Sequence, residues 1–449
     1  MSRPLAWAAA LAAFGAAARA EAPLTLDEAL TAAARDSRDL AIARADAAAA
    51  RADAGASWAG FLPRLDLTTT LGRQVSGPQA AQTYVLGGVP VAVPAQGATD
   101  QEAYFAQVQL QQPIFDGLRN VREVESAHAQ ERAAGRQLDE AMLSVAFAVT
   151  QRFYELVKAQ RTFAVLGDTV RRSEELVARA DALFAAARAP RADVFQARVN
   201  LGNDRIAVEA QRAAVARARA SLAVVLGRAP DAPLEVVAPA AVDAARVPDA
   251  VLPPLDALVG AARARRPALA AQAALLDAAR AQVGVAQAGY WPTVGLSGSY
   301  TRQSAKASGE DGVYGDPSRN YAAIGQVVVT WNLFSGRQTL SGVEKAEVGV
   351  RRAEATAART ADEVVREISD ARETAVALAR QVALSAENLA AAEQGLALAR
   401  QRLEAGLATQ LELRDANLKL TQAQLSLVQA RIDHQVAIAD LNRAVGGAL

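Results

Sequence analysis

The 449-residue chain contains no cysteine and only two histidines, His128 and His434. The lack of cysteine excludes a disulfide scaffold, a cysteine nucleophile and a cysteine-ligated metal, and two isolated histidines do not make a typical zinc site. Neither histidine lies in a serine–carboxylate pattern, and the sequence has no glycine-rich phosphate loop. We therefore expect no enzymatic activity, no cofactor and no bound metal.

An excess of charge of one sign is also missing, because 48 basic and 48 acidic residues give a net charge of zero. A chain that binds nucleic acid carries a basic surface, so nucleic acid is not an expected partner. The charges are interspersed along the sequence, as on solvated helix faces.

Long hydrophobic runs are absent as well: beyond residue 20 there is no stretch of 18 or more apolar residues, so we expect no membrane-spanning helix. At the N-terminus, Arg3 precedes a short apolar core, and the small residues Ala18 and Ala20 flank Arg19. This pattern predicts a signal peptide over residues 1–20, cleaved before Glu21, and hence export. No cysteine follows the core, so no lipid anchor is expected.

Proline is missing from two long stretches, between Pro113 and Pro190 and again after Pro317. We expect one long helix from Asp116 to about Ala187 and another from Ser335 to about Ala405. About 70 residues at about 1.5 Å per residue give a helix of roughly 100 Å, far longer than a globular helix.

Each long helix is followed by a break and a returning helix. Near the second break, Gly406 predicts the left-handed end of one helix, and Thr409 with Glu412 predicts a capping box for the next. The returning helix carries two apolar rows at seven-residue spacing: Leu411/Leu418/Leu425/Ile432 and Leu413/Leu420/Leu427/His434/Leu441. Heptad rows predict coiled-coil packing, and two rows on one helix require two packing partners.

The chain is internally duplicated. A shift of 219 residues places Val194, Leu201, Val208, Val215 and Leu222 on the row that begins at Leu413, and places Phe115-Asp116-Gly117 on Phe334-Ser335-Gly336. Upstream the shift is 229 and pairs Phe61-Leu62-Pro63 with Tyr290-Trp291-Pro292. The two shifts differ by an insertion in one loop, where insertions are tolerated best.

Both copies contain two alternating apolar and polar runs, typical of strands. In the first copy, Leu65 and Leu67 begin one run, a glycine- and proline-rich loop is expected over roughly 72–103, and the second run spans Tyr104 to Gln111. The polar faces carry Gln, Ser and Thr. These strands could form a small soluble sheet or the wall of a transmembrane barrel. Four strands cannot close a barrel and an open edge cannot face lipid, so a membrane barrel would require several subunits.

The expected organisation is therefore mainly α with a small β part. It comprises a signal peptide (1–20), a first repeat (21–227), a crossover linker (228–254) and a second repeat (255–449). The first repeat has its strand pair at about 63–113 and its long hairpin at about 116–227. The second has its strand pair at about 292–332 and its hairpin at about 335–446.

The chain resembles the TolC-type outer-membrane efflux proteins in its duplicated helix–strand–strand–helix–helix plan. It also resembles them in the strand starts at Pro63 and Pro292 and in the Phe-x-Gly turns at Phe115 and Phe334. The tip from Ala405 to Thr409 resembles theirs too. The resemblance covers essentially the whole mature chain. It implies a homotrimer in which four transmembrane strands per subunit form a 12-stranded β-barrel in outer-membrane lipid, above an α-helical periplasmic barrel.

The resemblance also implies function. Such proteins are passive exit ducts of tripartite efflux or type I secretion systems of Gram-negative-type cells, and work with a periplasmic adaptor and an inner-membrane transporter. A non-channel periplasmic coiled-coil adaptor or spacer remains the alternative, although an adaptor normally has one hairpin and soluble β domains. The transported substrate is not indicated.

By the same resemblance, the adaptor-docking residues are the two hairpin tips: Ala187, Arg188, Ala189 and Pro190 in the first copy, and Gly406, Leu407, Ala408 and Thr409 in the second. The first tip departs from the family pattern because it lacks the glycine. In addition, Leu403 and Ala408 stand where the family's closing tethers have a tyrosine and an arginine.

Glu412 and Asp415 occupy positions at which the resembling proteins place carboxylates lining the periplasmic mouth, and Asp193 is equivalent to Glu412 in the first copy. Stacked rings of like charge would favour cations. For Glu412 a role in the helix cap is the competing interpretation. His434 lies on an apolar row and is expected to be packed, and His128 to be solvated.

Overall fold

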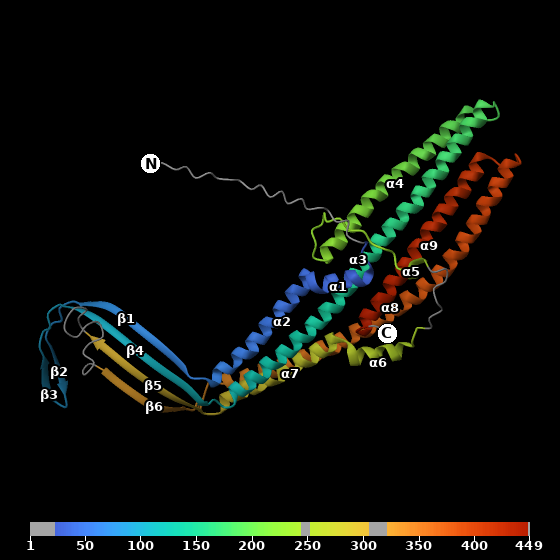
Figure 1. Cartoon of the computed structure of the whole chain (residues 1–449). Helices are drawn as coiled ribbons and strands as arrows, with labels where there is room; N and C mark the ends of the chain where they lie inside the picture. Colours follow the sequence, from blue (N-terminus) through green and yellow to red (C-terminus); the bar gives the residue numbers. More distant parts are fainter. Residues whose placement is uncertain (1–22, 244–251, 305–320, 448–449) are drawn as a thin grey trace, which may run out of the picture. The chain divides into compact units, whose positions relative to one another are not determined.

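The computed structural model describes residues 23–243, 252–304 and 321–447. The expected signal peptide and residues 244–251 of the crossover linker lie outside the described residues. The chain divides into two compact units, and the long helices α3 (Arg119–Ala185) and α8 (Gln338–Glu404) contribute to both (Figure 1). No helix in the described part of the chain is long and apolar enough to cross a membrane.

One unit comprises residues 44–138 and 267–362 and contains a four-stranded antiparallel sheet in the order β1-β4-β5-β6 (Figure 1). The strands are β1 (Arg64–Ser76), β4 (Thr99–Phe115), β5 (Thr293–Ser304) and β6 (Tyr321–Thr330). Leu67 pairs with Val108, Val108 with Tyr300, and Tyr300 with Ala323. The expected apolar and polar faces are therefore aligned across all four strands, since side chains in register share a face.

The expectation of a loop over residues 72–103 was wrong at both ends and in the middle. β1 continues to Ser76 and β4 begins at Thr99, and Arg73 bridges to Asp100 across the pair at 2.6 Å. Between them lies a second hairpin, β2 (Gln82–Leu86) and β3 (Val89–Val93). Gly87 and Gly88 both have positive φ, the conformation that a two-residue hairpin turn requires.

Each strand pair leads into a long helix through the same cap. The amide of Asn120 donates to Asp116 Oδ2 at 2.8 Å, and in the second copy the amide of Thr339 donates to Ser335 Oγ at 3.3 Å. The same unit holds most of α2 (Arg38–Ala56), α7 (Pro267–Gln287) and the short helices η1 (Ser57–Phe61) and η2 (Ala288–Tyr290).

The other unit comprises residues 1–43, 139–266 and 363–449. It contains α1 (Leu26–Asp36), α4 (Arg191–Val225), α5 (Ala240–Asp243), α6 (Leu255–Arg265) and α9 (Gln410–Val445), together with the larger parts of α3 and α8. Its core is an apolar cluster that includes Phe153, Leu156, Leu222, Leu226 and Ile432.

The heptad prediction for α9 is confirmed for one row and only partly for the other. Leu413, Leu420, Leu427, His434 and Leu441 are all buried. In the other row Ile432 is buried, whereas Leu411 and Leu418 are exposed. His434 is packed, as expected, and desolvation lowers the pKa of its imidazole, so the neutral ring is favoured.

The helix before each strand pair is broken at equivalent positions, Ser37 between α1 and α2 and Arg266 between α6 and α7. A left-handed glycine after the returning helix lies against each break: Gly227 (φ 76°) and Gly446 (φ 93°). A Cβ on Gly227 would lie 2.1 Å from the carbonyl oxygen of Asp36, and one on Gly446 would lie 3.0 Å from backbone atoms of Arg265 and Arg266. The duplication thus repeats a backbone-to-backbone contact that only glycine permits.

Replacing Gly227 with alanine is expected to lower the free energy of unfolding by at least about 2 kcal/mol. An alanine in the left-handed conformation costs about 1–2 kcal/mol, and its Cβ would overlap the backbone of Asp36, which is held in place by the helix it ends. The matched control is Gly167→Ala in the interior of α3, where a Cβ meets nothing within 4 Å; it should stabilise by up to about 1 kcal/mol. Thermal unfolding of the two variants measures the difference, and equal melting temperatures would contradict the contact.

Candidate functional site

The two hairpin tips end their first helices with the same hydrogen bonds. In the first copy Ala187 N donates to Phe184 O at 2.9 Å and Arg188 N to Leu183 O at 2.9 Å. In the second, Gly406 N donates to Leu403 O at 3.1 Å and Leu407 N to Arg402 O at 2.8 Å. This is the Schellman pattern, which places one residue in the left-handed conformation.

That left-handed residue is Gly406 (φ 73°) in the second tip and Ala187 (φ 56°) in the first. The missing glycine therefore changes the energy of the first tip and not its backbone path, since alanine adopts this conformation at a cost of about 1–2 kcal/mol. Most tip residues are exposed, with Ala189 and Ala408 half-buried.

The returning helices begin differently in the two copies. Thr409 Oγ1 accepts from the amide of Glu412 at 3.2 Å, which is the hydroxyl half of the expected capping box. The carboxylate of Glu412 lies instead 3.9 Å from Arg402 Nη1. The first copy has Pro190 at the cap position, where the side chain makes no capping hydrogen bond. The start of α9 is thus fixed more firmly than the start of α4.

The three sequence-predicted carboxylates do not form one cluster within a chain. Asp415 is exposed and its Oδ2 lies 2.7 Å from Lys419 Nζ, so its charge has a counter-ion one turn away. Asp193 is half-buried and lines a small cavity of about 110 Å³ with Gln410 and Arg414. No metal-binding cluster of His, Cys, Asp and Glu occurs among the described residues.

Below the tips, the two hairpins are joined by a buried ion pair that the sequence analysis did not identify. Arg414 on α9 donates from Nη1 to Asp204 Oδ2 at 2.9 Å and from Nη2 to Asp204 Oδ1 at 3.0 Å. Both side chains are only 12% exposed. Ser173 Oγ accepts a hydrogen bond from Arg414 at 3.0 Å and also bonds Asp204. Such a bidentate pair fixes one register of α9 against α3 and α4.

A second polar contact continues the same seam. The hydroxyls of Thr169 on α3 and Thr421 on α9 lie 3.0 Å apart, and Arg172 Nη2 donates to both, at 2.9 and 3.0 Å. Buried polar groups are costly unless paired, so a shifted register would leave several groups unsatisfied. The sequence gave little indication of the Arg414–Asp204 pair, because two residues more than 200 positions apart form no recognisable motif.

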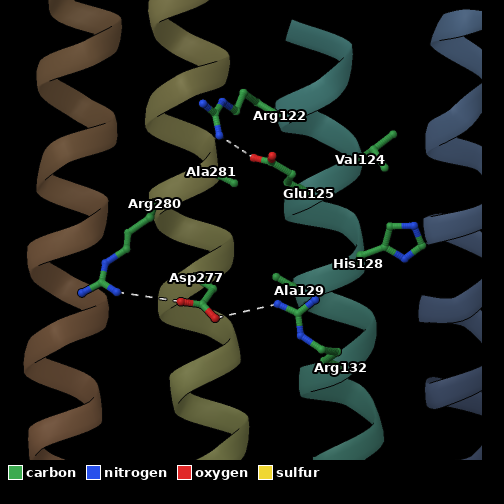
Figure 2. Close-up of a pocket in the computed structure, with 9 residues that line it drawn as sticks. All are labelled: Arg122, Val124, Glu125, His128, Ala129, Arg132, Asp277, Arg280 and Ala281. Atoms are coloured by element: carbon green, nitrogen blue, oxygen red, sulfur yellow. Dashed lines mark hydrogen bonds and ion pairs between the residues drawn. The ribbon is translucent and has the colours of Figure 1, made fainter. Parts of the chain in front are cut away.

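The sheet-containing unit has a wide hollow between α3 and α7, of about 580 Å³ (Figure 2). Its charged side chains pair with one another: Asp277 lies 3.8 Å from both Arg132 and Arg280, and Arg122 lies 2.7 Å from Glu125. His128 at its edge contacts Glu131 at 3.1 Å, and this hydrogen bond lowers the pKa of the Glu131 carboxyl. The charged side chains of the lining thus form surface ion pairs.

Comparisons with known proteins agree with this architecture. The model of the outer membrane efflux protein family matches residues 29–228 and 258–447, most of the chain. Outer membrane protein OprJ of Pseudomonas aeruginosa is 27% identical over 183 residues, which is 41% of this chain and 37% of OprJ. Protein CyaE of Bordetella pertussis is 32% identical over 232 residues, 50% of this chain and 47% of CyaE. The matched segments therefore span less than half the length of each relative.

Among solved structures, the open state of the MtrE outer membrane channel of Neisseria gonorrhoeae is similar to the chain with a TM-score of 0.75. The match covers 94% of this chain and 89% of that one at 18% identity. At this identity the likeness concerns the fold, and it extends over both duplicated halves.

The two tips provide matched variants. Ala187→Gly is expected to stabilise the first tip by about 1 kcal/mol, and Gly406→Ala to destabilise the second by a similar amount, because each exchanges the residue in the left-handed position. Amide hydrogen exchange of the tip peptides measures both, with protection at Arg188 rising and at Leu407 falling by about five-fold. Unchanged exchange in both variants would rule out the shared Schellman geometry.

Proposed function

Because the chain belongs to the outer membrane efflux protein family, we propose that it is the outer-membrane exit duct of a tripartite efflux or type I secretion system. It would be a passive channel across outer membrane and periplasm. The energy for transport would come from an inner-membrane transporter, reached through a periplasmic adaptor.

One observation carries this proposal: among the described residues the four-stranded sheet has two unpaired edges, at β1 and β6, and an apolar face aligned across all strands. A sheet of this kind can lie in lipid only when its edges are closed, since unpaired backbone groups in hydrocarbon cost several kcal/mol each. Three copies, each contributing four strands, would close as twelve. The glutamine, serine and threonine face would then line a water-filled interior.

The hairpin tips are the proposed adaptor-docking surface. Most of their residues are exposed, both end their first helix with the same backbone hydrogen bonds, and Thr409 caps the helix that follows the second tip. A trimer would present six such tips in two kinds, because Ala187 to Pro190 and Gly406 to Thr409 differ in side chains. A coiled-coil spacer or adaptor would need no four-stranded sheet with an aligned apolar face.

The carboxylates near the tips, Glu412, Asp415 and Asp193, are the proposed lining of the periplasmic mouth. Asp415 is the strongest of the three, because it is exposed and, unlike Glu412, lies beyond the first turn of α9, where a carboxylate has a helix-capping role of its own. Its partner Lys419 offsets part of the charge, so the cation preference of a ring would depend on both residues.

Localisation and conduction test the duct. After expression with its N-terminal segment, the protein should be recovered in the outer-membrane fraction, and purified protein should form discrete conducting steps in planar lipid bilayers. Recovery as a soluble periplasmic protein without conductance would refute the duct and favour a spacer or adaptor.

Asp415→Asn and Lys419→Gln form an opposed pair of variants. If the two side chains face the mouth, Asp415→Asn should lower the preference for cations over anions, because it removes one negative charge per subunit. Lys419→Gln should raise that preference, because it removes one positive charge per subunit. Reversal potentials in a salt gradient measure both shifts, which should shrink at high salt. Identical reversal potentials in wild type and both variants would remove Asp415 from the mouth.

A further inference from the structure

The β2–β3 hairpin, called the outer hairpin below, is the far end of one two-stranded ribbon whose stem is β1 and β4. The last pair of the stem is Ser76 with Thr99, and the first pair of the outer hairpin is Gln82 with Val93. Five residues separate these pairs on each strand, and an isolated bridge joins the two strands midway. The ribbon therefore keeps a single register from the sheet to its turn.

The ribbon bends between the stem and the outer hairpin. The connecting segments, residues 77–81 and 94–98, contain Gly77, Pro78, Pro94 and Gly97, and glycine and proline interrupt strands. At the end of the sheet far from the helices, β2 and β3 turn away from the direction of β1 and β4 (Figure 1). The bend leaves the outer hairpin outside the four-stranded sheet.

One face of the outer hairpin is strongly apolar. Its members alternate along the two paired strands and are all exposed in the single chain: Tyr84, Leu86, Val89, Val91 and Val93. An isolated two-stranded hairpin is only marginally stable in water, and exposed apolar strands promote association. This face therefore requires a partner that covers it.

The outer hairpin also lacks the charges that keep a surface segment in water. Residues 74–99 contain no charged side chain, although 21% of the whole chain is charged. The segment between β5 and β6, which the duplication makes equivalent, has five charges in its sequence: Lys306, Glu310, Asp311, Asp316 and Arg319. Only the segment of the first copy is thus suited to pack against another apolar surface, because no like charges oppose the contact.

The register indicates to which side the apolar face belongs. Side chains alternate between the two faces of a ribbon, so even-numbered positions on the first strand share one face. In the stem these positions include Thr70, Gln74 and Ser76, and in the outer hairpin they are Gln82, Tyr84 and Leu86. The polar face of the stem would line the water-filled interior of the proposed duct. The apolar face that continues it is therefore directed toward the mouth of the barrel and away from the surrounding lipid.

The outer hairpin is also long enough to reach the axis of a barrel. Twelve strands about 4.8 Å apart and tilted by about 40° give a circumference of roughly 75 Å and a radius of about 12 Å. The five residues of β2, at about 3.3 Å each, span roughly 16 Å. Outer hairpins from three copies could therefore meet over the mouth.

We propose that the outer hairpins of the three copies fold over the outer mouth of the barrel and pack their apolar faces against one another. The partner of each apolar face is the same face of a second copy, with Tyr84, Leu86 and Val91 at the contact. Together they form a hydrophobic plug, which stops water and ions as other hydrophobic constrictions do. This inference rests on the proposed duct, to which it adds a closure at the cell surface.

The absence of cysteine allows a direct test by cross-linking. Leu86→Cys in the full-length protein, oxidised in isolated outer membranes, should give a disulfide-linked dimer on a denaturing gel, because the plug brings identical residues together near the axis. The matched control is Val85→Cys. Val85 is 70% exposed and Leu86 74%, but Val85 lies on the opposite face, so this variant should remain a monomer.

Two double variants test closure with equal added charge. Tyr84 pairs with Val91 on the apolar face, and Thr83 pairs with Ala92 on the other face. Tyr84→Asp/Val91→Asp should open the plug by charge repulsion, whereas Thr83→Asp/Ala92→Asp should leave it closed. The readout is Gln109→Cys on the polar face of β4, labelled in whole cells by a bulky, membrane-impermeant maleimide. Labelling should be at least ten-fold faster with Tyr84→Asp/Val91→Asp than with the control pair or with neither.

The outcomes separate the plug from the duct. A dimer from Leu86→Cys and not from Val85→Cys, with labelling accelerated only by Tyr84→Asp/Val91→Asp, supports the plug. If the protein conducts and reaches the outer membrane but Leu86→Cys does not cross-link, or Gln109→Cys labels equally fast in every background, the plug is overturned and the duct stands. A protein that neither reaches the outer membrane nor conducts contradicts the duct and the plug with it.

Discussion

Backbone hydrogen bonding at the edges of the sheet is the constraint on which the structure depends. β1 and β6 are the outer strands of the four-stranded sheet, and its apolar face is continuous across the register. In lipid such edges must be paired, and the chain itself supplies no further strand to the sheet within its described residues. A subunit with this sheet is stable in a membrane only as part of a closed set of copies.

The duplication repeats a small set of local structures in the two halves of the chain. Gly227 and Gly446 rest on equivalent helix breaks, Asp116 and Ser335 cap equivalent helices, and the two tips end in one hydrogen-bond pattern. The copies differ in the loop between their strands and in the first residues of the returning helices, where Thr409 caps α9 and Pro190 does not cap α4.

Much of this organisation was predictable from the sequence. The long helices, the heptad row through Leu413 and the faces of the strands follow from periodicity, because burial repeats with the geometry of the element. The hairpin at β2 and β3 was missed because glycines and prolines in and around it indicated a loop, although Gly87 and Gly88 are the turn signal. The left-handed Ala187 was missed because alanine gives no warning of that conformation. The Arg414–Asp204 pair depends on which helices meet, which local pattern does not determine.

The mass of the purified protein in detergent, measured by native mass spectrometry, tests the central claim most directly. The account predicts a single dominant species at three times the mass of the mature chain, because one chain cannot close the edges of its own sheet. A stable species with the mass of one chain, folded and with its strands intact, would contradict it.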